Sequence, residues 1–279
     1  MEDSIALALS LQGPIMVHFS SWGMHMAIYL ANTGLELLIK GDSLDEEQLL
    51  TWFKEAKRIP AVQGAYYSKL FDSGLELVYR TVQQGDDLQI AGRDMHMSGG
   101  CLWMAKPLAR VGEGEALAVS LLMTNADESS AFIAELIHAA TLEHIDEDSS
   151  LSLQVCAFPQ SMDIYDSRAS YEEATEKVSR LDDRKLLPFN YIMARDESLT
   201  QESRDKYAEN EKLMVFAAPV LKVEKREHGY KGTSCMVATV ATEMGHLDLV
   251  FASQQLSKAL EKGSYVVCSA LISADVITT

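Results

Sequence analysis

The feature that most limits the folds available to this chain is a series of short apolar segments separated by turn residues. In the middle of the chain, glycine- and aspartate-rich turns separate four such segments: Leu75–Val82, Leu88–Gly92, Cys101–Ala105 and Leu117–Thr124. Segments of this length and composition are typical of β-strands. A regular alternation of single strands with single helices is missing, so we expect a largely antiparallel sheet and rank a doubly wound parallel fold second.

Three further segments show the apolar spacing of amphipathic helices. The first begins with a capping box, in which Ser43 is followed three residues later by Glu46. Residues 1–195 are therefore predicted to form an acidic α+β domain with a mostly antiparallel sheet and two or three helices. The three helices are expected over roughly Ser43–Lys57, Glu128–His144 and Ser170–Leu181.

The last third of the chain changes composition twice. Residues 196–212 carry nine charged side chains and few apolar ones, which is typical of a solvated connecting helix. Residues 213–279 then show four strand-like segments, with a short helix expected around Ser253–Leu260 before the last of them. This pattern predicts a charged linker helix followed by a small β-barrel domain.

The strand segments of this last domain also carry a resemblance. They resemble the C-terminal β-module of some uncharacterised bacterial proteins, in which a glycine precedes the last strand, as Gly263 does here. The resemblance covers residues 213–279 and implies a small OB-like β-barrel; it implies no activity. The segments that carry it are Val220–Glu224, Met236–Thr242, Leu247–Val250 and Gly263–Ala270.

The net charge is distributed unevenly along the chain. The formal net charge is −17 at pH 7, yet residues 213–279 contain equal numbers of acidic and basic side chains, so the whole excess lies in residues 1–212. A strongly acidic surface repels phosphate backbones, and we therefore expect no nucleic-acid partner. The four cysteines are scattered, and the first residues resemble neither a signal peptide nor a membrane span. These features predict a cytoplasmic protein that is not bound to a membrane.

One cysteine and two histidines are the candidate catalytic residues. Cys101 follows a Ser-Gly-Gly turn and lies five residues after His96, and His25 and His96 are each the centre of a Met-His-Met tripeptide. A thiolate beside glycine-freed N–H groups and an imidazole could act as a nucleophile. The alternative is that Cys101 is a buried strand residue and that the methionines pack into the core. Thioether and imidazole would suit a soft metal, but suitably spaced acidic or thiolate ligands are missing, so neither metal nor cofactor is expected.

Acidic side chains gather at the two ends of the second predicted helix. Such a one-sided field can steer a basic protein partner, although it can equally serve solubility. Glu135 and His138 lie three residues apart within this helix, and as a single copy they are expected to form a surface pair rather than half of a di-iron site. The candidate partner-binding residues are Asp127, Glu128, Glu143, Asp146, Glu147 and Asp148.

Motifs that would name a reaction are missing from the sequence. It contains no P-loop, dinucleotide fingerprint, HExxH, GxSxG or EF-hand loop. We therefore expect a non-catalytic interaction or regulatory protein that binds a basic partner through its acidic residues, as an inhibitor or immunity protein would. The alternative is a thiol-dependent or hydrolytic enzyme that uses Cys101 with His96 or His25. A homodimer remains open.

Overall fold

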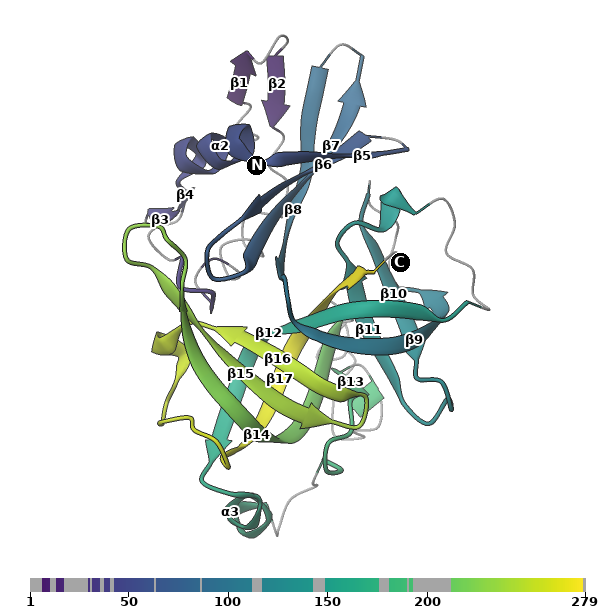
Figure 1. Ribbon diagram of the computed structural model, residues 1–279, viewed down its shortest axis with the longest axis vertical. Coiled ribbons are helices and arrows are strands. Elements are labelled where there is room, and N and C mark those ends of the chain that lie inside the picture. The colour runs from purple at the N-terminus through teal and green to yellow at the C-terminus, as the bar shows by residue number, and fades with distance from the viewer. Residues whose placement is uncertain are drawn as a thin grey trace, which may run out of the picture.

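The structure combines a small four-stranded sheet with a larger sheet of nine strands (Figure 1). It is a computed structural model that describes residues 7–10, 14–17, 30, 32–35, 38–40, 43–62, 64–85, 87–111, 117–142, 149–175, 181–189, 191–192 and 212–277. The larger sheet consists of β9 (Cys101–Arg110), β10 (Val119–Thr124), β11 (Ala131–Leu136), β12 (Leu151–Tyr165), β13 (Leu187–Pro188), β14 (Leu213–Glu227), β15 (Ser234–Thr242), β16 (Gly245–Phe251) and β17 (Tyr265–Val276).

This larger sheet closes on itself twice. Its strand order is β13-β14-β15-β16-β12-β17-β11-β10-β9, and β14 also pairs with β17 while β12 also pairs with β9. The strands β14, β15, β16, β12 and β17 therefore form one closed ring, which we name the first barrel. The strands β9, β10, β11, β17 and β12 form another, the second barrel, and the two rings share β12 and β17.

The two shared strands are long enough to serve both barrels. β12 has 15 residues and β17 has 12, and they pair antiparallel along most of their length. The register shifts between Pro159 and Ser161, and a bulge of this kind bends a strand so that it can leave one barrel and enter the other. One hydrophobic core accordingly runs through both rings, from Phe216 and Phe251 in the first to Trp103 and Phe132 in the second.

The four-stranded sheet has one apolar face and one mixed face, on which Tyr66 and Val78 lie among polar side chains. It consists of β5 (Lys57–Ala61), β6 (Gly64–Leu70), β7 (Leu75–Gln84) and β8 (Asp87–Met97), paired antiparallel in that order. Leu77 and Met95 belong to the apolar face and share a core cluster with the helix α2 (Glu46–Glu55) and with Val237 and Val250 of the first barrel. The opposite face carries Glu76, Arg80, Asp94 and His96, because these residues alternate with the apolar ones.

The helix α2 lies within the first predicted helix, but the capping box predicted at Ser43 is wrong, because Ser43 belongs to β4. The N-cap of α2 is Asp45, whose side chain accepts a hydrogen bond from the backbone N–H of Gln48 at 3.3 Å. Two acidic residues in the first turn and Lys54 in the last turn complement the helix dipole. The apolar positions Leu49 and Phe53 are buried against the four-stranded sheet.

The remaining described elements are short. They are β1 (Leu7–Ser10), β2 (Pro14–Val17), β3 (Ile39–Lys40), β4 (Ser43–Leu44), α3 (Arg168–Ala174) and the 3-10 turns η2 (Ala139–Thr141) and η3 (Ser253–Gln255). The short helix expected over Ser253–Leu260 is thus only a 3-10 turn. Within the described part of the chain, the helices are too short or too polar to cross a membrane.

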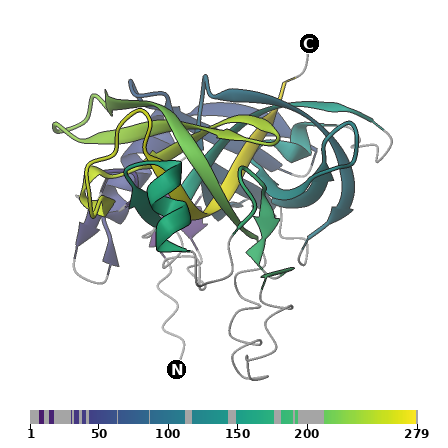
Figure 2. The ribbon, with the colours of Figure 1, turned by 90° about the horizontal axis from the view of Figure 1, so that it is seen from below.

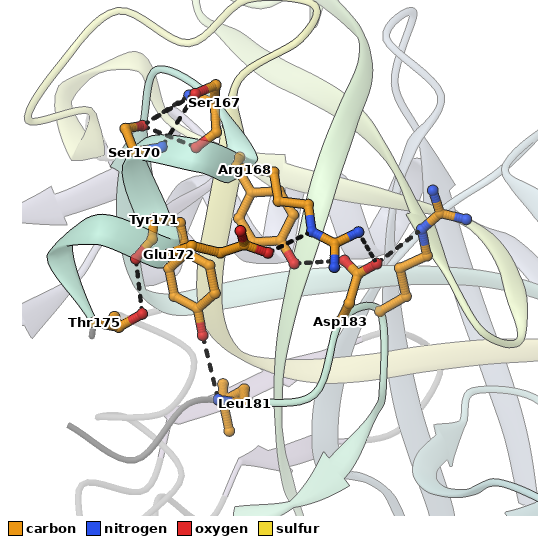
Figure 3. A network of polar contacts seen from close by, with 10 residues as sticks. Ser167, Arg168, Ser170, Tyr171, Glu172, Thr175, Leu181 and Asp183 are labelled. Atoms are coloured by element: carbon orange, nitrogen blue, oxygen red, sulfur yellow. Dashed lines mark hydrogen bonds and ion pairs between the residues drawn. The ribbon is translucent and has the colours of Figure 1, made fainter. Parts of the chain in front are cut away.

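The helix α3 lies below the first barrel and is tied to it by a polar and aromatic network (Figures 2 and 3). The ring of Tyr171 stacks on that of Tyr265 with centroids 5.0 Å apart. The Tyr265 hydroxyl donates to Asp183 at 2.6 Å, and Arg168 contacts both Asp183 and Glu172 at 2.9 Å. The third predicted helix is therefore present only over Arg168–Ala174 among the described residues, with its cap at Ser167.

The expected fold class is wrong. The protein is mostly β, with two α-helices among the described residues, rather than an α+β domain of two or three helices joined to a barrel. The largest error is the helix expected over Glu128–His144, which is the strand β11 followed by η2. Phe132 lines the interior of the second barrel while Ile133, on the opposite side of the strand, is covered as well. A strand buried on both faces gives a continuous apolar run that periodicity cannot distinguish from a helix.

Strands from both predicted domains share one sheet. Residues 213–279 supply four strands of the first barrel, but its fifth strand is β12, which lies within residues 1–195. The linker expected over 196–212 lies, apart from Lys212, outside the described residues. The division into two domains and the OB-like resemblance both stay predictions.

Candidate functional site

Cys101 opens β9 and is only half-buried, yet its surroundings do not activate it. Burial, together with the charge and side-chain hydrogen bonding of Asp248, raises the pKa of its thiol to about 12. The preceding glycine is required because a Cβ at Gly100 would lie 2.8 Å from the carbonyl oxygen of Val155. The Ser-Gly-Gly turn thus allows a close strand contact, and the neighbouring carboxylate disfavours a thiolate.

His96 lies next to a different cysteine from the one expected. Its Nδ1 atom is 3.0 Å from Ser273 Oγ and 3.6 Å from Cys156 Sγ. His96 and Cys156 are both completely buried, and burial raises the pKa of the Cys156 thiol. His25 lies outside the described residues. The structure therefore brings His96 together with Cys156 rather than with Cys101, in a place that a substrate cannot reach.

We expect Cys101 to resist alkylation in the folded protein. A thiol whose pKa is raised to about 12 has almost no thiolate at neutral pH, and the thiolate is the reactive form. The measurement is peptide mass spectrometry after iodoacetamide treatment at pH 7.5, with urea-unfolded protein as the control. Rapid and selective labelling of Cys101 in the folded protein would contradict this assignment and revive the thiol-enzyme hypothesis.

A row of polar side chains, mostly buried except for the partly exposed carboxylate of Asp275, joins the four-stranded sheet to the second barrel. We name it the seam and define it as Arg80, Asp94 and His96 on the sheet, with His138, Ser273 and Asp275 on the barrel. His96 contacts Ser273, and His138 Nδ1 donates to Asp275 Oδ2 at 3.2 Å. Ser273 and Asp275 are two residues apart on β17 and so point to the same side of the strand.

His138 also packs on an aromatic ring of the sheet. Its ring meets Tyr66 edge-on with centroids 5.2 Å apart. The Tyr66 hydroxyl donates to the carbonyl of Leu117 at 2.8 Å and accepts from the backbone N–H of Ala140 at 2.9 Å. His138 is thus a buried interface residue and does not form the expected surface pair with Glu135, which lies 3.7 Å from Lys212 instead.

The seam also contains a buried ion pair. Arg80 Nε lies 2.8 Å from Asp94 Oδ2, and the Arg80 side chain is completely buried. The guanidinium fits only because residue 92 is glycine, since a Cβ there would lie 2.3 Å from Arg80 Nη2. Burial raises the pKa of Asp94 to about 6, although the charge of Arg80 lowers it.

The acidic candidate residues do not lie on one helix. Asp127 and Glu128 form the turn between β10 and β11, where Asp127 accepts hydrogen bonds from the backbone N–H and the hydroxyl of Ser129. Those hydrogen bonds lower the pKa of Asp127, which keeps it ionised. Glu143, Asp146, Glu147 and Asp148 lie outside the described residues.

A set of exposed apolar side chains lies beside this acidic turn. Leu102, Met104 and Leu108 are 63 %, 54 % and 45 % exposed and alternate along β9 with buried residues. Ile277 is also exposed and belongs to the same side, because Ser152 lies opposite Met104 and its carbonyl accepts from the N–H of Ile277. We name Leu102, Met104, Leu108 and Ile277 the β9 face.

The β9 face meets the acidic turn at Lys106. Lys106 pairs across the strands with Thr124, the last residue before the turn, and its Nζ lies 3.9 Å from Glu128 Oε1. Exposed apolar side chains and the acidic turn therefore form one continuous surface. The sequence alone did not reveal this surface, because Leu102–Trp103–Met104 is an apolar run in which nothing shows which side faces water.

The structure gives less support to two other kinds of site, a basic patch and a metal site. The basic residues near the β14–β15 hairpin are matched by neighbouring acids: Lys222 and Arg226 contact Glu224, and Lys225 contacts Glu227. Within the described ranges, no group of three His, Cys, Asp or Glu side chains is arranged to hold a metal ion. The β9 face and its acidic turn are therefore the candidate functional site.

Comparison of the chain with protein-family models, with curated proteins and with solved structures finds no match.

Proposed function

We propose that this protein is a non-catalytic binding protein that holds a basic protein partner on the β9 face and the adjoining Asp127–Glu128 turn. The observation that carries the proposal is the exposure of Leu102, Met104 and Leu108 on a strand that is hydrogen-bonded on both edges. The solvent side of an antiparallel sheet ordinarily carries polar residues. A contiguous apolar set with a polar rim is typical of a protein-binding surface.

The chemistry of the partner follows from charge. The formal net charge of −17 attracts a basic protein at long range and repels a second acidic one, including a second copy of this chain. Close to the β9 face, Glu128 offsets the charge of Lys106 and leaves Asp127 available to a cation. Arg110 lies beyond Leu108 at the other end of β9, so we place the cationic part of the partner at the turn.

The thiol-enzyme alternative receives less support from the same geometry. Cys101 and Cys156 both have a raised pKa, and the cysteine beside His96 is completely buried. A binding role needs none of these groups to be reactive. A cytoplasmic location and the absence of a nucleic-acid partner remain part of the proposal.

The test is affinity capture from native extract at low salt, using the full chain and two double variants. The variant Leu102→Ser/Met104→Ser removes the centre of the β9 face. The control Val62→Ser/Leu70→Ser removes two apolar side chains that are at least as exposed, at 81 % and 58 %, from the β5–β6 turn and the end of β6. We expect a basic protein that binds the full chain and the control alike, and whose affinity, re-measured with purified protein, falls at least about tenfold in the β9-face variant.

The acidic turn should act mainly on the rate of association. We expect Asp127→Asn/Glu128→Gln to slow association several-fold at low salt and to have little effect at high salt, because screening removes steering. Equal binding by the β9-face variant and the full chain would contradict the proposal. Failure to capture any basic protein that depends on this face would count against it in the same way.

A further inference from the structure

The seam places two histidines in one interface together with acidic and basic side chains. We propose that the seam is a pH-sensitive contact that holds the four-stranded sheet on the second barrel most tightly near pH 6.5 and loosens on either side of this value. The proposal is independent of partner binding on the β9 face. It rests on how the two histidines are held.

His138 lies between the two sheets and has a carboxylate partner. Its side chain is 10 % exposed, its Nδ1 lies 3.2 Å from Asp275 Oδ2, and its ring packs on Tyr66 of β6. The other charged groups that act on it are Glu76 of β7 and Asp94 of β8. Burial lowers the pKa of His138, but the hydrogen bond and charge of Asp275, together with the charges of Glu76 and Asp94, outweigh it, so that the pKa is raised.

His96 lies in the same interface but has neutral hydrogen-bonding partners. It is completely buried, and its Nδ1 contacts Ser273 Oγ and Cys156 Sγ. Asp275, Glu76 and His138 are the titratable groups that act on it through their charge. Burial dominates these and lowers the pKa of His96. The surroundings of His138 thus favour its charged form, whereas those of His96 favour its neutral form.

These two opposite directions define a window of pH. The contribution of His138 is complete below its ordinary pKa of about 6.5 and is lost as the pH rises through its raised folded value. The contribution of His96 is complete above about 6.5 and is lost as the pH falls toward its lowered folded value. Asp94 has the opposite effect to His96. Its raised pKa favours the folded state as the pH falls below about 6, and this reduces the loss of stability on the acidic side.

Opening of the seam can be measured by hydrogen exchange of the full chain between pH 5 and pH 9, corrected for the intrinsic exchange rate. Peptides from β7 and β8 report the seam, and peptides from β15, which lies in the first barrel, serve as the internal reference. From pH 6.5 to 8.5 we expect the opening equilibrium of β7 and β8 to rise about two- to fivefold, the range of a partly exposed ion pair. Below pH 6.5 we expect a rise as well, which Asp94 reduces below about pH 6.

Four variants assign the alkaline and the acidic side of this pH window. His138→Gln should abolish the rise above pH 6.5 and keep the one below it, and His96→Gln should do the reverse. His246→Gln, which replaces an exposed histidine of β16, should leave both sides unchanged. Asp275→Asn keeps both imidazoles but removes the carboxylate, so it should abolish the alkaline side even if a histidine variant fails to fold.

A flat profile for β7 and β8 between pH 6.5 and 8.5 in the wild-type chain would overturn the proposal. So would an alkaline rise that persists in both His138→Gln and Asp275→Asn. Neither result would affect the proposed binding function, which is measured at the β9 face.

Discussion

Replacing Asp94 by alanine is expected to lower the free energy of unfolding by about 3–5 kcal/mol, because it leaves the guanidinium of Arg80 buried without its counter-ion. The two side chains lie 2.8 Å apart and are 0 % and 9 % exposed, so water can barely replace the missing carboxylate. The guanidinium of Arg80 also has little room to move, since it packs closely against the backbone of Gly92. Urea unfolding at pH 7, followed by circular dichroism, measures the loss.

Two controls separate a buried charge from an ordinary ion pair. Glu55→Ala removes the partner of Lys69 at an exposed pair, 2.7 Å apart, that joins the helix α2 to β6, and is expected to cost at most about 1 kcal/mol. The double variant Arg80→Met/Asp94→Leu replaces both charges by apolar groups and is expected to recover most or all of the stability. If Asp94→Ala costs no more than Glu55→Ala, the guanidinium is not desolvated and the seam is open to water.

Local sequence signals predicted the positions of most strands, but they did not predict how the nine-stranded sheet closes into two barrels. The turn glycines Gly85 and Gly99 have positive φ values, and each separates two strands that the sequence predicted. The amphipathic spacing and polar start of α2 likewise placed that helix. These signals act within a few residues. They carry no information on which strand lies beside which, and this explains why the order of the nine strands was not foreseen.

The double closure depends on contacts between distant parts of the chain. β12 pairs with β16 and β17, about 100 residues later, and with β9, about 50 residues earlier. A strand that pairs on both edges and is buried on both faces is apolar throughout, and its sequence does not name its neighbours. The misassigned β11 has the same cause, because its apolar residues satisfy the helical and the strand period at once.

The candidate site shows the same limit. Asp127 and Glu128 were recognised from sequence as acidic, and Asp127 keeps its charge at the turn. Their relation to Leu102 and Met104 required the pairing of β9 with β10, which places Lys106 beside Thr124. His138 was expected on a surface because its helix was expected there. Its burial follows from the seam, which forms only when the four-stranded sheet packs on the barrel.

Replacing Trp103 by alanine is the second large effect we expect, about 3–5 kcal/mol of unfolding free energy. Trp103 is 2 % exposed and fills the interior of the second barrel, where its ring meets Phe132 edge-on with centroids 5.0 Å apart. Its Nε1 donates to the carbonyl of His246 at 2.7 Å, so the truncation also removes a hydrogen bond between β9 and β16. A closed five-stranded ring has little freedom to collapse around the cavity, which places the cost at the upper end of this range.

The neighbouring residue supplies the control, because Leu102 is adjacent in sequence but points away from the core. Leu102→Ala is expected to change the unfolding free energy by less than about 0.5 kcal/mol, since its side chain is 63 % exposed. Urea unfolding of both variants tests the inward and outward assignment of β9 directly. Trp103→Phe should fall between them, because it keeps most of the packing and loses the hydrogen bond. Similar losses for Trp103→Ala and Leu102→Ala would mean that β9 does not alternate as described, and both the second barrel and the β9 face would have to be abandoned.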